Sequence, residues 1–196
     1  MDYELRKATL DDQPLLQQLI ARSIRALGAG DYSQEQIEAA LRGAFGLDSG
    51  LIRDGTYFVA VTDSGEIVAC GGWSRRRTLF GSDARTDRDE SNLDPRTDAA
   101  KVRAFFVDPG HARRGLGRAL LERSETEAMR AGFSMFELMA TLPGVKLYEK
   151  FGYRAGEAVA YPLPGGLTIR FVPMTKRSNA PATATKTWRH PGATSR

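Results

Sequence analysis

The chain has 196 residues, of which 41% are hydrophobic and 27% are charged, and its formal net charge is +4. These are ordinary values for a globular protein, and the length suits one domain with a real core, with or without a tail. No apolar run approaches the roughly 20 residues that a membrane-spanning helix needs, and the single cysteine, Cys70, excludes an internal disulfide and a cysteine-based metal cluster.

The N-terminus and the histidines narrow the class of protein further. Residues 1–4 are polar and acidic and do not resemble a secretory signal, so we expect a cytoplasmic protein without a membrane partner. The two histidines, His111 and His190, lie far apart in unrelated surroundings, which gives a two-histidine zinc site little support. We therefore expect no bound metal.

The charge is unevenly distributed along the chain. Residues 1–98 contain 12 Lys and Arg against 17 Asp and Glu, whereas residues 99–196 contain 16 against 7. A basic half suits a polyanionic partner, either a phosphorylated cofactor or nucleic acid, although unequal decoration of a surface is common.

The first half of the chain predicts one strand, two helices and a hairpin. The first helix has an apolar stripe at helical spacing, and the second begins with a capping box formed by Ser33 and Gln36. In chain order, the expected elements are a strand at 3–8, a helix capped by Thr9 or Asp11 and stopped at Gly28, a helix from Ser33 to about Phe45, and hairpin strands at 56–62 and 67–73.

The second half opens with residues 81–98, a polar stretch with six acidic and three basic side chains that we interpret as a long loop. The expected elements after it are a strand at 101–107, a helix at 116–131, a strand at 133–140, a short helix at 144–151, and a hairpin with strands at 153–161 and 167–175. This mixed order, with hairpins at both ends, predicts an α/β (α+β) fold with a partly antiparallel sheet. From Lys176 onward acids are absent, so we expect one domain at 1–175 and a basic, low-complexity tail at 176–196.

The most informative stretch runs from Val107 to Leu121 and reads VDPGHARRGLGRALL. A strand ends there, a turn follows, and a loop rich in glycine and arginine opens a helix. Free backbone N–H groups, the positive end of the helix dipole and the close approach that glycine permits all favour an anion at such a site. A basic helix start without a ligand is the plainer alternative.

Two nucleotide-binding loops can be compared with this stretch. Gly110 and Gly115 have the spacing of a Walker A loop, but Leu116 and Gly117 stand where that loop needs its lysine and hydroxyl. Gly115 and Gly117 also begin a dinucleotide-binding pattern, but Leu120 replaces its third glycine. Both patterns therefore fail on specific residues.

The stretch resembles instead the pyrophosphate loop of the GNAT superfamily of N-acetyltransferases, where Gln/Arg-x-x-Gly-x-Gly/Ala opens a helix after a strand. Arg114-Gly115-Leu116-Gly117 fits that pattern, whereas Ala112 stands where Gln or Arg is usual. A second segment, Leu147 to Tyr153, resembles the family's tyrosine-bearing helix and the Gly-aromatic pair that opens the next strand. The resemblance covers roughly residues 1–175, except for the details of 81–98.

The resemblance implies a GNAT-like fold, with a mixed, mostly antiparallel central sheet and helices on both faces. Two parallel strands, here 101–107 and 133–140, splay apart, and the pantetheine arm of acetyl-CoA lies between them. Backbone groups of the first strand bind pantetheine, the Val107 amide faces the thioester carbonyl, and the loop binds the pyrophosphate. The implied cofactor-binding residues are Phe105, Phe106, Val107, Ala112, Arg113, Arg114, Gly115, Leu116, Gly117, Arg118 and Ala119.

The implied reaction is transfer of the acetyl group to a primary amine by direct attack, with Tyr148 as the general acid that protonates the departing thiolate. A packing role for Tyr148 is the alternative. The general base is not readable, because residues 103–106 offer no carboxylate. Glu137, a water chain and the loop at 81–98 stay open, although Glu137 is more typical of a surface or ion-paired residue. Cys70 lies among small residues, which is typical of a core thiol rather than a nucleophile.

The acceptor stays open between a small molecule and a protein. The six acids of residues 81–98 could attract a cationic amine, although such a charge run is usually a solvated face. Arg75 to Arg77 could bind an acidic group or the cofactor, and Trp73 could line the pocket or cover the core.

Two other functions were weighed against acetyl transfer. A GNAT-like module that binds acyl-CoA without turnover fits Ala112 and the missing strand carboxylate, but the tyrosine at 148 argues against it. A nucleic-acid binder that uses Arg75 to Arg77 and the tail ranks last, because these segments lack interleaved aromatics apart from Trp188. The oligomeric state, a homodimer included, is not fixed by the sequence.

Overall fold

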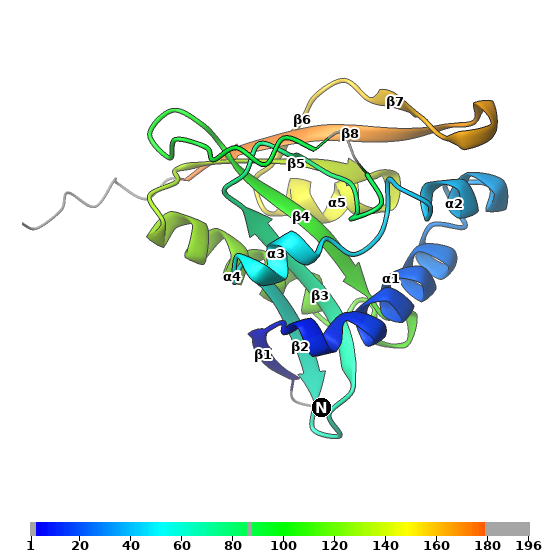
Figure 1. The fold of residues 1–196 in the computed structure, drawn as a ribbon, viewed down its shortest axis with the longest axis horizontal. Helices are drawn as coiled ribbons and strands as arrows, with labels where there is room; N and C mark the ends of the chain where they lie inside the picture. The colour runs from blue at the N-terminus through cyan, green and yellow to red at the C-terminus, as the bar shows by residue number, and fades with distance from the viewer. Residues whose placement is uncertain (1–2, 86–87, 179–196) are drawn as a thin grey trace, which may run out of the picture.

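The computed structural model describes residues 3–85 and 88–178, which form one central sheet with helices on both sides (Figure 1). The strands are β1 (Tyr3–Lys7), β2 (Tyr57–Thr62), β3 (Ile67–Ser74), β4 (Ala100–Val107), β5 (Met135–Thr141), β6 (Arg154–Ala155), β7 (Val159–Pro162) and β8 (Thr168–Arg177). The α-helices are α1 (Gln13–Leu27), α2 (Gln34–Ala40), α3 (Ser49–Arg53), α4 (Leu116–Arg130) and α5 (Val145–Lys150). Short 3-10 turns lie at Leu10–Asp12, Pro109–His111, Leu142–Gly144 and Pro164–Gly166.

The sheet is mixed and mostly antiparallel, as the sequence predicts. Its strand order is β1-β2-β3-β4-β5-β8-β6, and β7 pairs with β8 beside this path. The pair β4 and β5 runs parallel, and the other pairs are antiparallel. A parallel pair needs a long crossover, which α4 supplies, whereas β2 and β3 are joined by a tight turn.

Each face of the sheet buries its own apolar cluster. In Figure 1, α1, α2 and α3 lie in front of the sheet, and α4 and α5 lie behind it. The front cluster includes Leu16 and Ile20 of α1, and the back cluster includes Leu120 and Leu121 of α4. All four side chains are 0–1% exposed, so burial of these two helical stripes is a main source of stability.

The two parallel strands are paired only at their beginnings. Within the described residues, the β4–β5 ladder consists of Ala100 opposite Phe136 and Lys101 opposite Glu137. From there β5 continues to pair with β8 as far as Thr141. The two strands therefore splay apart toward their carboxyl ends.

A bulge bends β4 at the start of this splay. The register of β4 against β3 shifts between Cys70 and Gly72, and Ala104 has a φ of 57°, which is unusual for a residue with a side chain. The hydroxyl of Tyr57, a fully buried residue, donates a 2.9 Å hydrogen bond to the Ala104 carbonyl. This bond fixes the bulge from β2, which lies on the other side of β3.

The structure corrects four boundaries expected from the sequence. The helix after Ser33 ends at Ala40 rather than near Phe45, because residues 41–46 form turns that pack under the segment between β3 and β4. Residues 49–53 form α3, which the sequence does not predict. The expected strand at 153–161 is interrupted and forms β6 and β7, and β8 reaches Arg177, two residues beyond the end expected for the last strand. Of the expected tail at 176–196, residues 179–196 lie outside the described part of the chain.

Candidate active site

The loop that opens α4 has an unusual backbone. Gly115 is the N-cap of α4 with a φ of 86°, and Arg113 has a φ of 61°, so the chain makes two left-handed steps just before the helix. No side chain caps this end of the helix. Among the described residues, nothing accepts a hydrogen bond from the N–H groups of Leu116 and Gly117. Uncapped N–H groups at the positive end of a 15-residue helix are a fitting cradle for a phosphate.

The charged side chains of this loop are partly engaged with the protein. The Arg118 guanidinium donates to Glu122 at 2.8 Å and lies 5.9 Å from the centre of the Phe151 ring. His111 Nδ1 lies 3.6 Å from Asp108 Oδ1, and its ring makes an edge-to-face contact with Tyr3. The backbone amides, rather than these side chains, are therefore the groups most open to an anion.

Tyr148 lies on α5, next to the place where β4 and β5 separate. Its ring makes edge-to-face contacts with Phe105 of β4 and with Tyr153, at centroid distances of 6.3 and 5.7 Å. Burial raises the pKa of the Tyr148 phenol above its usual value, because a phenolate would lose its hydration there. The hydroxyl therefore stays protonated at neutral pH and can act as a proton donor.

A pocket opens at the splay and connects the two apolar clusters. Six aromatic residues contribute to its lining: Phe45, Phe80, Phe105, Phe106, Tyr148 and Phe171. Phe105 and Tyr148 belong to the cluster behind the sheet, whereas Phe80, Phe106 and Phe171 belong to the cluster in front. The cavity measures about 70 Å³, which is room for about five water molecules. A substrate arriving from one face can therefore meet a second substrate arriving from the other.

The amide of Val107, at the end of β4, already has a partner. It donates a 3.2 Å hydrogen bond to the hydroxyl of Ser23, a residue of α1 that is 4% exposed. No signal in the sequence indicates this contact, because Ser23 lies 84 residues from Val107, on a helix face that is otherwise apolar. Ser23 is thus a residue of the site that sequence reasoning missed.

The comparison with known families bears on this arrangement directly. The profile of the acetyltransferase (GNAT) family matches residues 21–153, which is more than half of the chain. The chain belongs to the GNAT acetyltransferase family. The family's general reaction is acetyl transfer that depends on acetyl-CoA, and the enzyme is accordingly an acyltransferase. No curated protein sequence matches the chain significantly.

Solved structures share the GNAT fold with this chain at low sequence identity. A GCN5-related N-acetyltransferase from Rhodopseudomonas palustris is similar with a TM-score of 0.66 and 21% identity, over 90% of this chain and 96% of that one. The PaiA N-acetyltransferase from Thermoplasma acidophilum, in complex with coenzyme A, has a TM-score of 0.62 and 16% identity, over 90% of this chain and 99% of that one. The ribosomal-protein-S18-alanine N-acetyltransferase from Escherichia coli has a TM-score of 0.55 and 18% identity, over 93% of this chain and 99% of that one. At these identities the likeness concerns the fold.

In the GNAT domain the expected site residues lie at the end of β4, in the loop and first turn of α4 that follow it, and on α5. Phe105, Phe106 and Val107 form the end of β4 beside the splay, and residues 112–119 form the loop and first turn of α4 that follow directly. Tyr148 stands across the pocket from β4 on α5. Cofactor binding by these residues stays a prediction.

The structure shows the burial and the contacts of three further residues that the sequence analysis considered for the site. Cys70 is fully buried, and burial raises the pKa of its thiol to about 12, so a thiolate nucleophile is strongly disfavoured. Glu137 forms an ion pair with Lys101 across the β4–β5 ladder. Trp73 is 4% exposed and packs edge-to-face on Phe133, so it covers the core instead of lining the pocket.

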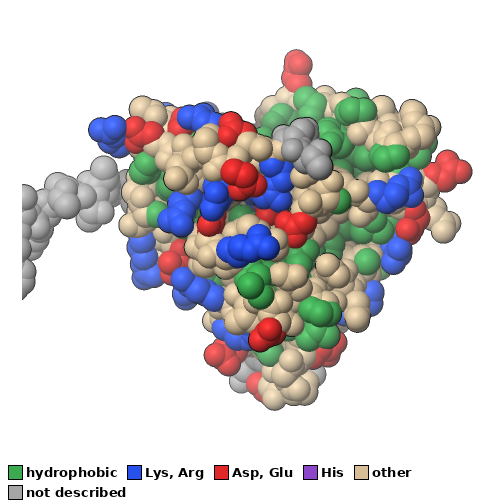
Figure 2. All heavy atoms as spheres, in the orientation of Figure 1, with side chains coloured by type: hydrophobic (Ala, Val, Ile, Leu, Met, Phe, Trp, Pro, Cys, Tyr) green, Lys and Arg blue, Asp and Glu red, His purple; other side chains and the backbone are tan. Residues whose placement is uncertain are grey.

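The acids expected to attract a cationic acceptor are engaged with other groups. Asp83 and Glu90 both contact Arg88, Asp94 pairs with Arg96, Asp98 pairs with Arg77, and Asp89 accepts hydrogen bonds from Ser91. Asp87 lies outside the described residues. Figure 2 shows the result as red and blue side chains lying side by side over α3 and the segment between β3 and β4. None of these described acids lines the pocket.

The arginines at the end of β3 are also paired. Arg76 makes a two-pronged contact with Asp54, at 2.6 Å for both hydrogen bonds, and Arg75 lies 4.0 Å from the same carboxylate. They therefore brace α3 against the end of β3.

Residues 3–85 and 88–178 contain neither a candidate membrane-spanning helix nor a candidate metal-binding cluster. No helix in these ranges has the length and apolar character needed to cross a bilayer. No group of three or more His, Cys, Asp or Glu side chains in the same ranges is arranged to hold a metal ion.

Proposed function

We propose that the protein transfers the acetyl group of acetyl-CoA to a primary amine, with β4, the α4 loop and Tyr148 forming the catalytic site. The observation that carries the proposal is the splay of the parallel pair, which opens beside an uncapped helix start and a buried tyrosine. The splayed part of β4 and Tyr148 line one pocket, and the loop that opens α4 follows β4 directly in the chain. The proposed domain spans residues 1–175, followed by the basic tail at 176–196.

The cofactor fits residues that the fold leaves available. The N–H groups of Gly115, Leu116 and Gly117 would hold the pyrophosphate, because they lie at the positive end of α4. They belong to the expected cofactor loop, which runs from Ala112 to Ala119. The backbone edge of Phe105 to Val107 that faces β5 would hold the pantetheine amides, because β4 pairs with β5 only at Ala100 and Lys101. When bound, acetyl-CoA supplies the activated acyl group.

The chemical step follows from the position of Tyr148. The amine nitrogen attacks the thioester carbonyl, the carbon–sulfur bond breaks, and Tyr148 donates its phenolic proton to the departing thiolate. The thiolate is a weaker base than the phenolate, because the usual pKa of a thiol, about 8.5, lies below that of a phenol. The transfer is therefore completed when the phenolate regains a proton, through solvent, from the positively charged nitrogen that the attack leaves behind. The Val107 amide is placed to stabilise the oxyanion if it exchanges Ser23 for the carbonyl oxygen.

The pocket supplies no general base of its own. Among the described lining residues there is neither a carboxylate nor a histidine. The acceptor must then enter as the free amine, and its proton is lost to solvent. We expect kcat/KM for the amine to rise with pH in parallel with the fraction of unprotonated amine, which a comparison of two amines of different basicity will test.

Thiol release from acetyl-CoA over a panel of amines tests the proposal and separates it from a non-catalytic module. Amine-dependent thiol release at a rate well above hydrolysis supports an enzyme. Binding of acetyl-CoA by calorimetry, with no release over the whole panel, would instead support the alternative of an acyl-CoA-binding GNAT module.

A further inference from the structure

The acceptor side of the pocket is walled by apolar side chains, and the polar surface of the pocket belongs to backbone groups, Tyr148 and Arg103. This inference rests on the proposed function, because it concerns the second substrate of the same site. Phe45, Phe80, Phe106 and Phe171 line the half of the pocket in front of the sheet, joined by Met139 of β5. Binding of an acceptor with an aromatic or aliphatic group is favoured when that group is buried against these side chains, by about 25 cal/mol per Å² of apolar surface removed from water.

The one charged residue in the described lining is already neutralised. Arg103 of β4 is 5% exposed, and its Nη2 lies 2.8 Å from Oδ2 of Asp48, a residue with no exposed surface. The same nitrogen donates a 2.9 Å hydrogen bond to the Gly81 carbonyl. A second cationic group on the acceptor would therefore meet a positive guanidinium and no available carboxylate.

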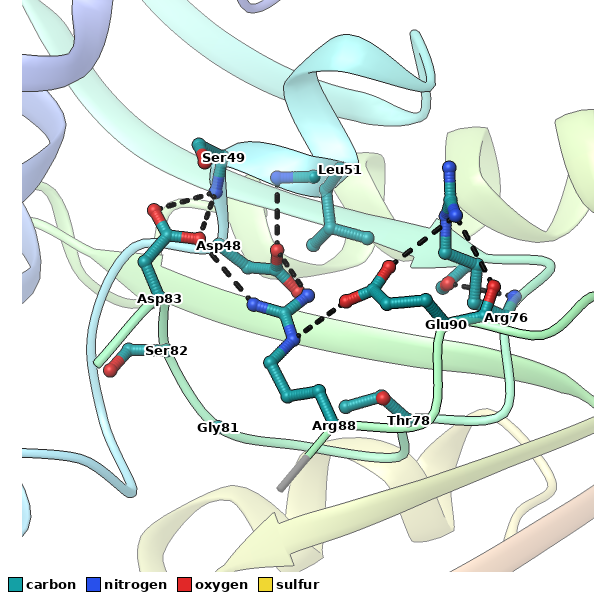
Figure 3. Close-up of polar contacts among 12 residues, drawn as sticks. Asp48, Ser49, Leu51, Arg76, Thr78, Gly81, Ser82, Asp83, Arg88 and Glu90 are labelled. Atoms are coloured by element: carbon teal, nitrogen blue, oxygen red, sulfur yellow. Dashed lines mark hydrogen bonds and ion pairs between the residues drawn. The ribbon is translucent and has the colours of Figure 1, made fainter. Parts of the chain in front are cut away.

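The wall of the pocket is held in place by a buried charge cluster. Figure 3 shows the Arg88 guanidinium reaching between Asp48, Asp83 and Glu90. Its contacts with these carboxylates measure 2.8 Å, 3.4 Å and 2.9 Å, and the Arg88 side chain is 11% exposed. Asp48 thus joins Arg103 of β4 to Arg88 of the segment between β3 and β4.

Further hydrogen bonds fasten the same segment to the residues before α3. The Asp83 carboxylate accepts from the Ser49 N–H, and the Asp83 N–H donates to the Leu47 carbonyl at 2.9 Å. The Ser82 N–H donates to the Gly43 carbonyl at 3.0 Å. Phe80, two residues earlier, packs edge-to-face on Tyr161 and tilted against Phe171. Phe80 and Gly81 are therefore presented to the pocket by a braced segment.

We propose that the acceptor is a primary amine carried on an apolar, aromatic body, and that Asp48 and Arg88 are positioning residues that hold Phe80 and Gly81 as the wall of its pocket. A polyamine or another polycationic acceptor does not fit, because the described lining offers no carboxylate to pair with a second positive charge. Asp48 does not touch either substrate and acts through the segment that it fastens.

The acceptor class is tested with the full chain and two probe amines, 2-phenylethylamine and 1,4-diaminobutane. Thiol release from acetyl-CoA gives kcat/KM for each, and we expect a preference of about tenfold or more for 2-phenylethylamine. Phe80→Ala should lower kcat/KM for this amine by about tenfold and leave the Kd of acetyl-CoA unchanged. Leu10→Ala, which truncates a side chain that is 49% exposed, is the matched control and should change neither quantity.

The outcomes distinguish the acceptor inference from the proposed function. Equal or reversed preference for the two amines, or no turnover of either by protein that binds acetyl-CoA, would overturn the acceptor class and leave the cofactor site standing. A failure to bind acetyl-CoA would remove the proposed function and the acceptor inference together.

The positioning role is tested at Arg88, because Asp48→Asn leaves Arg103 buried without its partner and risks unfolding. Arg88→Gln should raise KM for 2-phenylethylamine severalfold while kcat and the Kd of acetyl-CoA stay near wild type, and Arg88→Lys should recover part of the loss. The control is Arg96→Gln, since Arg96 lies in the same segment, is 87% exposed and pairs with Asp94. Equal amine KM values for Arg88→Gln and Arg96→Gln would overturn the positioning role.

Discussion

Tyr148 is the residue on which the proposed chemistry turns. It lines the pocket, it packs on Phe105 of β4, and burial raises its pKa, so its proton is retained over the working pH range. The resemblance of the segment around it to a family motif was enough to single it out from the sequence. Its neighbours in space, Phe105 and Tyr153, could be named only from the structure.

The first prediction concerns Tyr148→Phe, which removes the proton donor and keeps the ring. We expect kcat to fall by about a hundredfold or more, because general acid catalysis contributes on that scale, while the Kd of acetyl-CoA stays the same. Tyr153→Phe is the matched control, since Tyr153 is a buried neighbour in the same cluster that does not line the pocket. An unchanged kcat in Tyr148→Phe would reduce the residue to a packing role. In the wild type, the raised pKa also predicts no loss of kcat from tyrosine ionisation up to about pH 10.

The second prediction concerns Ser23→Ala, which removes the partner of the Val107 amide. A buried N–H left without an acceptor costs about 1–3 kcal/mol, so the free protein should lose stability in that range. If the thioester carbonyl takes the place of Ser23, acetyl-CoA should bind more tightly to the variant and restore part of the lost Tm. Ser124→Ala, at a buried serine that bonds to the Leu120 carbonyl within α4, should lose stability without any gain in affinity. Equal affinity in Ser23→Ala and wild type would mean that Val107 does not face the cofactor.

At the scale of elements, the start of α4 is the proposed site of the pyrophosphate. The third prediction contrasts two glycines there. Gly115→Ala places a side chain at a φ of 86° with nothing within 4 Å of the new Cβ, so its cost of about 1–2 kcal/mol comes from backbone strain alone. Gly117→Ala puts a Cβ 3.2 Å from Leu147 Cδ2, but the better helix propensity of alanine offsets much of this, and the change should stay below about 1 kcal/mol. Chemical denaturation of both variants measures the difference, and equal losses would contradict the assigned geometry.

Most of the helices and strands could be predicted from the sequence, and the exceptions have physical reasons. The strands of the sheet, apart from the break at 153–161, and the long helices α1 and α4 were predicted, because their apolar periods and capping residues are local signals. The parallel pair β4 and β5 was expected from the family resemblance, and the structure confirms it. Anion binding by the loop before α4 stays a prediction. The helix α3 was not predicted, since five residues that include Gly50 carry no period. It forms because Asp48 caps it, with its side chain accepting from the Gly50 N–H, and because Leu51 and Ile52 are buried.

The long-range contacts of the site could not be predicted from the sequence. Asp48 meets Arg88 and Arg103, which lie 40 and 55 positions further along the chain, and nothing in a single sequence pairs those charges. The acids of residues 81–98 look like one cluster in the sequence, but the fold distributes the described ones among several local arginines. The apolar acceptor pocket arises only where β4, β5, β8 and the segment between β3 and β4 meet.

At the scale of the whole molecule, paired carboxylates make stability depend on pH. Asp54 beside Arg76 and Asp12 beside Arg6 both have a pKa below the usual value of 3.8, chiefly because of the hydrogen bonds from their arginines. The unfolded chain therefore binds more protons than the folded chain in acid, so this stabilisation is complete above a pH of about 4 and is lost as the pH falls.

The fourth prediction follows from that sign. The free energy of unfolding should fall as the pH drops from about 5 to about 3, and Arg76→Gln should reduce the slope because the pKa of Asp54 returns toward its usual value. Arg25→Gln is the control, since its pair with Glu38 is exposed on both sides. Identical acid slopes in Arg76→Gln and wild type would show that the pair at Asp54 does not contribute.

In the whole molecule, the apolar clusters on the two faces of the sheet meet at the pocket beside the splayed strands. The proposed acetyl transfer first requires that the protein binds the coenzyme through its diphosphate. Calorimetric titration of the full chain with CoA and with pantetheine, which lacks the diphosphate and the nucleotide, tests this most directly. We expect CoA to bind with measurable heat and pantetheine to bind about a hundredfold more weakly, because each hydrogen bond to a charged group is worth about 1.5–3 kcal/mol. Equal affinities for the two compounds, or no heat with CoA, would contradict the proposed grip of the α4 loop.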